Sequence, residues 1–205
     1  MAGSRAEKKE QTRQALLDRT IELVHDRSFG SLSLREVARG AGIVPTAFYR
    51  HFASMEDLGI TLVEDSMRVL RRALREGRRD LAKSGMPIAR ESLAILQRHV
   101  HAERAKFQFL VREQHGGVAE VRRAIDTELR LFSRELAIDL ARVPALAQWE
   151  ADDLEVAADL IVSIMMTTVA DLLDGDGRPA TEDALIRRAE KQLVMVLLGM
   201  GEWRT

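Results

Sequence analysis

The sequence predicts an all-α protein with a three-helix head, which contains a helix-turn-helix, and a six-helix body. Three observations predict this class. Apolar residues return at intervals of three and four along most of the 205 residues. Capping signatures and breaks at Gly or Pro divide the chain into helical segments. No segment alternates polar and apolar residues with the period of two that is typical of strands. We expect the head at residues 1–53 and the body at residues 54–205.

The first three expected helices lie in the head. Residues 6–26 are amphipathic and are followed by a break that ends at Gly30. Ser33 and Glu36 have the spacing of a capping box, so a second helix begins at Leu34. It ends by Gly42, because glycine adopts the left-handed conformation that closes a helix. A third helix then spans Pro45–His51, since proline suits a first helical turn.

The remaining helices form the body. A second capping signature at Ser54 opens a long fourth helix that ends near residue 81, and a loop follows at residues 84–87. Glycine and proline breaks separate the later helices, which we expect at residues 87–101, 103–114, 118–142, 150–173 and 182–201.

Composition and charge limit the function. The chain is 46% hydrophobic and 31% charged and has no cysteine, which excludes disulfides and thiol chemistry. Neither a secretion signal nor an apolar stretch of the roughly 20 residues needed for a membrane span is evident, so we expect a cytoplasmic protein. Residues 1–52 hold nine basic and six acidic side chains, a net +3, whereas the whole chain has −1. A basic head on an acidic body favours phosphate binding by the head.

The second and third helices, joined by a tight glycine-containing turn, form the helix-turn-helix. In this motif the second helix lies in the major groove, with its N-terminal residues towards the bases. Thr46 and Ala47 suit base edges and thymine methyl groups, and Arg50 suits guanine or phosphate. Tyr49 and His51 suit phosphate oxygens. The residues expected to contact DNA are Lys8, Lys9, Ser33, Arg35, Thr46, Ala47, Tyr49, Arg50, His51 and Ser54. The alternative is that the aromatic residues are core and the basic residues form a solvated surface.

Residues 12–62 closely resemble the N-terminal domain of TetR-family repressors, above all in the run LREVARGAGIVPTAFYRHF from Leu34 to Phe52. The resemblance implies a homodimer that binds double-stranded palindromic operator DNA and a small molecule that changes the affinity for DNA. The longer run SLSLREVARGAGIVPTAFYRHF at Ser31–Phe52, together with FQFLVREQHGG at Phe107–Gly117, resembles the FabR and DesT branch, which regulates unsaturated fatty acid synthesis. That branch implies a long-chain acyl-CoA or fatty acid effector. The alternatives are a regulator of efflux or catabolism that senses an unrelated apolar ligand, and an effector-independent DNA binder.

Two sets of body residues complete the prediction. The resemblance implies that the last two helices meet their copies in a four-helix bundle, and small side chains at helical spacing would permit close approach, with an intrachain core as the alternative. The expected interface residues are Leu154, Ala157, Ala158, Ile161, Met165, Leu185, Ala189, Leu193, Val196 and Leu197. Apolar residues and one arginine are candidates to line an effector pocket, with core packing as the alternative: Phe107, Phe109, Leu110, Arg112, Phe132, Leu136, Met165 and Met166.

The sequence predicts no enzyme. None of the five histidines belongs to an HExxH element, and the chain has no phosphate loop, dinucleotide fingerprint or nucleophile elbow. We therefore assign no catalytic residues, metal or cofactor.

Overall fold

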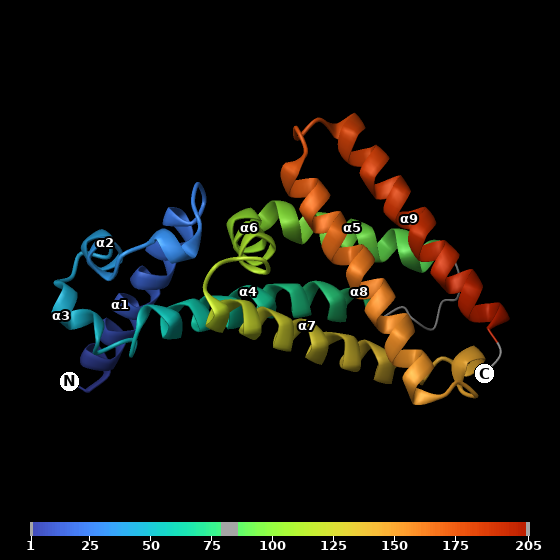
Figure 1. Cartoon of the computed structure of the whole chain (residues 1–205), viewed down its shortest axis with the longest axis horizontal. Helices are drawn as coiled ribbons and strands as arrows, with labels where there is room; N and C mark the ends of the chain where they lie inside the picture. Colours follow the sequence, from blue (N-terminus) through green and yellow to red (C-terminus); the bar gives the residue numbers. More distant parts are fainter. Residues whose placement is uncertain (1, 79–85, 204–205) are drawn as a thin grey trace. The chain divides into compact units, whose positions relative to one another are not determined.

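The computed structural model describes residues 2–78 and 86–203, and throughout this part of the chain the regular elements are helices (Figure 1). The all-α prediction is confirmed. The α-helices are α1 (Ala2–Leu23), α2 (Leu34–Gly40), α3 (Pro45–Phe48), α4 (Met55–Arg78), α5 (Met86–Ala102), α6 (Arg104–Glu113), α7 (Ala119–Leu140), α8 (Ala151–Asp174) and α9 (Pro179–Glu202). Short 3-10 helices lie at η1 (Phe29–Ser31) and η2 (Pro144–Leu146). Part of the loop expected at residues 84–87 falls outside the described residues.

Contacts group the chain into two compact units. The head unit comprises residues up to 66 together with 108–126, and the body unit comprises residues 67–107 together with 127–205. The head unit is therefore larger than the expected segment 1–53. It takes in the first half of α4, the end of α6 and the beginning of α7. Helical periodicity reports a local pattern, whereas this grouping depends on contacts between segments far apart in the sequence.

Local signals explain the helices of the helix-turn-helix. The Ser33 hydroxyl accepts a hydrogen bond from the Glu36 amide at 3.3 Å, as the capping signature predicts. Gly42 has φ +73°, the left-handed conformation expected after α2. Phe48 and Phe52 are buried with their ring centroids 5.8 Å apart, so α3 is held by its inward face.

The end of α6 belongs to the head unit because it packs on η1. The Phe29 and Phe109 rings meet edge to face with centroids 6.2 Å apart. The buried carboxylate of Glu113 accepts a hydrogen bond from the Phe29 amide at 2.8 Å. A Cβ at Gly59 of α4 would lie 2.6 Å from a Val121 methyl group, so this glycine permits close approach of α4 to α7.

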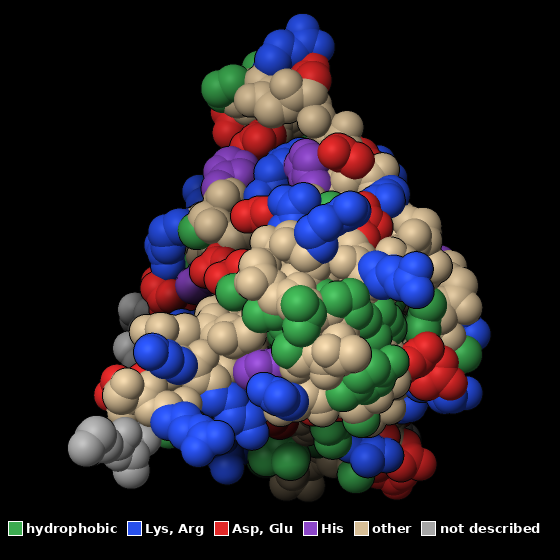
Figure 2. Space-filling view, turned by 90° about the vertical axis from the view of Figure 1, so that its left-hand side faces the viewer, with side chains coloured by type: hydrophobic (Ala, Val, Ile, Leu, Met, Phe, Trp, Pro, Cys, Tyr) green, Lys and Arg blue, Asp and Glu red, His purple; other side chains and the backbone are tan. Residues whose placement is uncertain are grey.

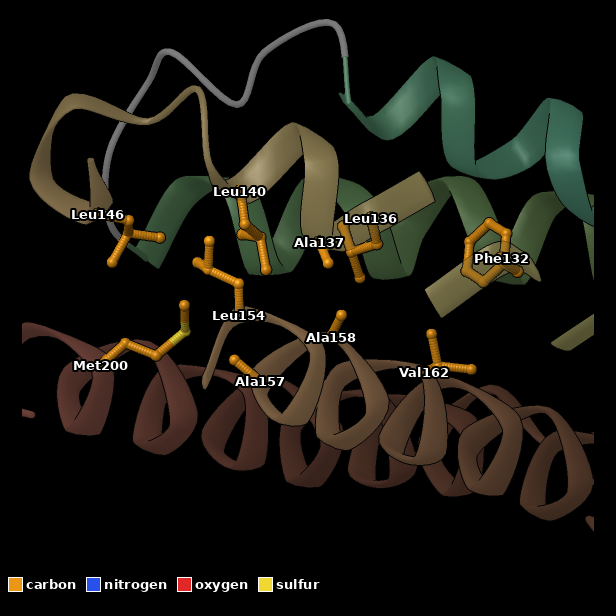
Figure 3. Packing of buried hydrophobic residues seen from close by; sticks show 10 residues of the cluster. All are labelled: Phe132, Leu136, Ala137, Leu140, Leu146, Leu154, Ala157, Ala158, Val162 and Met200. Atoms are coloured by element: carbon orange, nitrogen blue, oxygen red, sulfur yellow. The ribbon is translucent and has the colours of Figure 1, made fainter. Parts of the chain in front are cut away.

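In the body unit, α8 packs against α7 and α9, and α5 packs against both α8 and α9. Figure 3 shows the apolar side chains that α7 and α8 direct towards each other, with η2 and α9 each adding one. The cluster comprises Phe132, Leu136, Ala137, Leu140, Leu146, Leu154, Ala157, Ala158, Val162 and Met200. By length and composition α8 could cross a membrane, although nine of its 24 residues are buried within the body unit.

Polar contacts join α5 to α9 and α6 to α8. The buried Glu182 carboxylate on α9 accepts a hydrogen bond from the Gln97 amide group at 2.9 Å and contacts His101 Nε2 at 3.1 Å. The Arg104 guanidinium at the start of α6 donates to the Leu173 carbonyl oxygen at 2.6 Å. These bonds satisfy side chains that the apolar core would otherwise leave without partners.

Candidate nucleic-acid interface

The inward and outward sides of α3 and of the turn that follows it differ sharply. Phe48 is fully buried, whereas Thr46 and Arg50 are exposed and Tyr49 is 63% exposed. The Tyr49 ring meets the Phe48 ring edge to face at 5.8 Å, which orients an otherwise free side chain. Figure 2 is turned so that the left-hand side of Figure 1, where α2 and α3 are drawn, faces the viewer, and it shows hydrophobic side chains close to Lys and Arg side chains.

The sequence-based end of the third helix is wrong by three residues. The structure ends α3 at Phe48, whereas we expected Pro45–His51. The Arg50 and His51 amides bond to the carbonyls three residues earlier, at 3.1 and 2.9 Å, so the chain tightens into turns. No local residue signals this stop, which accompanies the burial of Phe52.

The helices on either side of α3 begin at serine caps. Ser33 is exposed at the start of α2. Ser54, partly buried at the start of α4, accepts a hydrogen bond from the Asp57 amide at 3.2 Å, and the Asp57 carboxylate accepts one from the Ala53 amide at 2.8 Å. Both serines thus lie at helix starts, where backbone amides and the helix dipole favour a phosphate.

Four expected DNA contacts are exposed cations: Lys8, Lys9, Arg35 and Arg50. Within residues 2–78 and 86–203, none of the four forms an ion pair. Other head arginines differ, since Arg27 pairs with Glu36 and the Arg13 guanidinium lies 4.7 Å from the Phe52 ring centroid. The hydrogen bond from Arg27 also keeps the pKa of Glu36 below its usual value. The head therefore separates structural arginines from cations that remain available for phosphate groups.

His51 lies among these cations. Its ring is partly buried, and Nδ1 is enclosed without a hydrogen-bond partner among the described residues. Burial lowers the pKa of His51, and the positive charges of Lys9, Arg13 and Arg50 lower it further, against a smaller opposing effect of Glu10. A phosphate at this position would offset the positive field.

The structure distributes the expected pocket residues over both units. Phe109, Leu110 and Arg112 belong to the head unit. The Arg112 guanidinium donates to the carbonyl oxygens of Val24 at 2.7 Å and Arg27 at 3.0 Å, a structural role after the end of α1. The other five lie in the body unit, four of them buried and Met166 partly buried: Phe107, Phe132, Leu136, Met165 and Met166.

The expected dimer residues mostly face the interior of their own chain. Leu154, Ala157, Ala158, Met165, Ala189 and Leu193 are buried within the body unit. The outward apolar side chains on the same two helices are Val156, Leu160, Met195 and Leu198, which are 51–69% exposed. A groove of about 260 Å³ continues this face. It is lined by Trp149, Asp153, Val156, Ala157, Leu160, Val196, Gly199, Met200 and Trp203.

The structure also exposes Val44, which sequence reasoning left out of the site. This residue precedes α3 and is 65% exposed. Its position before Pro45, where a polar cap is usual, was the available signal.

A helical head with these exposed aromatic and cationic side chains defines a DNA-binding protein of the helix-turn-helix class. The profile of bacterial regulatory proteins of the tetR family matches residues 16–59, and that of the tetracyclin repressor-like C-terminal domain matches residues 88–200. The chain belongs to the TetR family and is a transcriptional regulator of that family.

Solved structures share the fold. The fatty acid degradation regulator FadR from Bacillus halodurans has a TM-score of 0.70 at 16% identity, over 89% of this chain and 94% of that chain. FadR from Bacillus subtilis, in complex with stearoyl-CoA, has a TM-score of 0.66 at 18% identity, over 88% and 97%. AibR, in complex with isovaleryl coenzyme A and operator DNA, has a TM-score of 0.66 at 17% identity, over 89% and 98%.

Proposed function

We propose that the protein is a cytoplasmic homodimeric repressor that binds palindromic operator DNA and changes its affinity when a small apolar effector binds. The observation that carries DNA binding is the exposed outer side of α3, surrounded by cations that have no ion-pair partner within the described residues. Thr46, Ala47 and Arg50 contact bases, and Tyr49 and His51 contact phosphates. Lys8, Lys9, Ser33, Arg35 and Ser54 extend the phosphate contacts along the backbone.

Binding to the protein's own promoter region tests this function. A palindromic duplex from that region is titrated at physiological salt, beside a scrambled duplex of the same composition. Tyr49→Ala should weaken binding to the palindrome, because it removes the proposed phosphate contact of Tyr49. The variant should stay folded, because the ring is exposed and its loss does not open the core. Circular dichroism and the oligomeric state of this variant should match the parent. Equal binding of the parent protein to both duplexes would contradict sequence-specific operator binding.

We place the dimer interface on the outward faces of α8 and α9. Two copies that bury Val156, Leu160, Met195 and Leu198 against each other would cover an exposed apolar surface by a two-fold contact. The groove beside Trp149 and Trp203 continues that surface and would receive side chains of the second copy. The residues we first expected, such as Ala157 and Ala158, support this face from inside.

Charge substitution tests this interface. Leu160→Arg and Leu198→Arg should each convert the dimer to a monomer in light scattering, because a buried unpaired charge is strongly unfavourable. Ile138→Arg is the matched control, since Ile138 is 58% exposed but lies on α7. Dimers that persist in both α8 and α9 variants, or dissociation only in the control, would place the interface elsewhere.

The effector that we favour is a long-chain acyl-CoA or fatty acid that controls desaturation genes, as in the FabR and DesT branch. Support comes from two proteins of the same fold that are described in complex with acyl-CoA molecules. The proposed site for the acyl chain comprises the buried residues Phe107, Phe132, Leu136 and Met165 and the partly buried Met166. Methionine side chains there would adapt to an entering chain. Arg112 is omitted because two backbone carbonyls already engage it.

Ligand titration separates the alternatives. Oleoyl-CoA and palmitoyl-CoA should change operator affinity more than isovaleryl-CoA or free CoA does, if chain length provides the binding energy. A response only to an unrelated apolar compound would favour a regulator of efflux or catabolism. No response to any ligand would favour an effector-independent DNA binder.

A further inference from the structure

The three helices nearest the expected DNA surface begin differently. The hydroxyls of Ser33 and Ser54 each accept a hydrogen bond from a backbone amide in the first turn of α2 and α4. At α3 the same position is occupied by Val44, with φ −73° and ψ 148°, and no side chain caps the helix. Valine is among the least favourable residues at this position. The chain therefore forgoes a stabilising cap at the one helix expected to enter the groove.

Packing does not explain Val44. Its side chain is 65% exposed, and Val44 and Tyr49 are the large hydrophobic side chains that the described part of the head unit exposes. Pro45 beside it is exposed as well, and Ala47 is partly exposed. We call Val44, Pro45 and Ala47 the apolar tip. Val44 therefore departs from the preference for a polar cap without gaining buried contacts. Departures of this kind are expected at residues that serve function.

The surroundings of the apolar tip identify its partner as duplex DNA. Thr46 and Arg50 on the same short segment are exposed, and Arg50 has no ion-pair partner among the described residues. Cations beside the tip match the phosphate backbone. In the major groove, the apolar group that a base pair offers is the C5 methyl of thymine. Valine, proline and alanine side chains can neither donate nor accept hydrogen bonds, so they cannot read the other groups on the base edges.

We propose that the apolar tip reads thymine methyl groups, with Val44 as a specificity-determining residue. This inference rests on the proposed operator binding and says how one part of the half-site is recognised. Thr46 is the neighbouring residue that can add a hydrogen bond. Each half-site therefore contains at least one thymine whose methyl group packs against Val44.

The test begins with selection of preferred sites for the full-length protein from a library of random duplexes. Each thymine of the selected half-site is then replaced by deoxyuridine, which removes the methyl group and leaves the hydrogen-bonding pattern unchanged. Anisotropy titrations should show a loss of about fourfold in affinity at each contacted methyl, the ratio expected for burial of one such group. Selected sites with equal affinity for thymine and uracil at every position would overturn the inference alone.

Val44→Ser provides a second test, in which stability and specificity should change in opposite directions. The new hydroxyl can cap α3, so the melting temperature should stay the same or rise. The affinity ratio between thymine and uracil duplexes should nevertheless fall towards one. Ile138→Ser is the matched control, an exposed aliphatic residue of the body, and should keep the parent ratio. A Val44→Ser protein that keeps the full ratio would overturn the role of Val44. Failure of the parent to enrich any sequence would overturn operator binding and this inference together.

Discussion

The head unit and the body unit expose different mixtures of side chains. Around α3 the head exposes the polar groups of Thr46, Tyr49 and Arg50 beside the apolar side chain of Val44, a mixture that suits phosphates and base edges. On α8 and α9 the body exposes aliphatic side chains such as Leu160 and Leu198. The comparison teaches that the chemistry of the head's partner can be inferred from individual side chains. The body surface indicates only that an apolar partner covers it. The identity of the effector depends on the space that the packed core of the body can provide.

The largest effect is expected in the body core. Phe132 is 2% exposed and lies between α7 and α8, so Phe132→Ala should lower the free energy of unfolding by about 3–5 kcal/mol. Ile138→Ala on the same helix should change it by less than about 0.5 kcal/mol. Denaturant titration at fixed protein concentration measures both. A large effect of Ile138→Ala and a small one of Phe132→Ala would contradict the described packing.

A smaller effect should show whether Arg112 has a structural role in the head or binds the effector. Arg112→Ala removes two hydrogen bonds to the carbonyl oxygens of Val24 and Arg27, at a cost of about 1 kcal/mol of head stability. Arg123→Ala, which loses only an exposed pair with Glu120, should cost a few tenths of that. Thermal melts with and without effector measure both properties. A lost effector response at unchanged stability would instead return Arg112 to the pocket.

The smallest effect concerns pH. In the free protein the pKa of His51 is lowered by burial and by the cations Lys9, Arg13 and Arg50. A phosphate would offset those charges, so the pKa of His51 should be higher in the complex and binding should take up a proton. DNA affinity should then rise a few-fold as pH falls through the ordinary histidine pKa of about 6.5 towards the lowered pKa of the free protein. It should level off once pH is below the lowered pKa of the free protein.

Two glutamine variants check this assignment. His51→Gln should flatten the pH dependence of DNA affinity at constant salt. His25→Gln should keep it, because that exposed histidine instead contacts Gln108 Oε1 at 2.9 Å. Calorimetry in buffers of different ionisation enthalpy counts the protons directly. Parallel pH profiles for the parent and His51→Gln would exclude His51 as the titrating group.

Local signals in the sequence were sufficient for most helix boundaries in the head, and most of the residues they selected for the proposed DNA-binding surface are exposed. Ser33, Gly42 and Ser54 each act within a few residues of their own position, and the structure places the expected helix boundaries there. The end of α3 could not be predicted in this way, because no local residue marks the turn after Phe48. The burial of Phe52, which accompanies this turn, is a tertiary contact that the local sequence does not show. Val44 was missed because an aliphatic residue beside a helix is usually core.

Predictions for the body required distances that a sequence does not contain. Ala157 and Ala158 have the small side chains that suit close approach of two helices, yet the helix they approach is α7 of the same chain. Arg112 follows a run of apolar residues and suited a pocket, but its partners lie near residue 25, far away in the sequence. Periodicity gives the buried side of a helix without naming the element that buries it.

Whether the head reads a specific sequence is measured most directly by a ratio of affinities. The dimer is titrated at physiological salt with a selected palindrome and with a scrambled duplex of equal length and composition. Specific regulators prefer their sites by about 1,000-fold or more, and we expect a ratio in that range. A ratio near one would contradict the account.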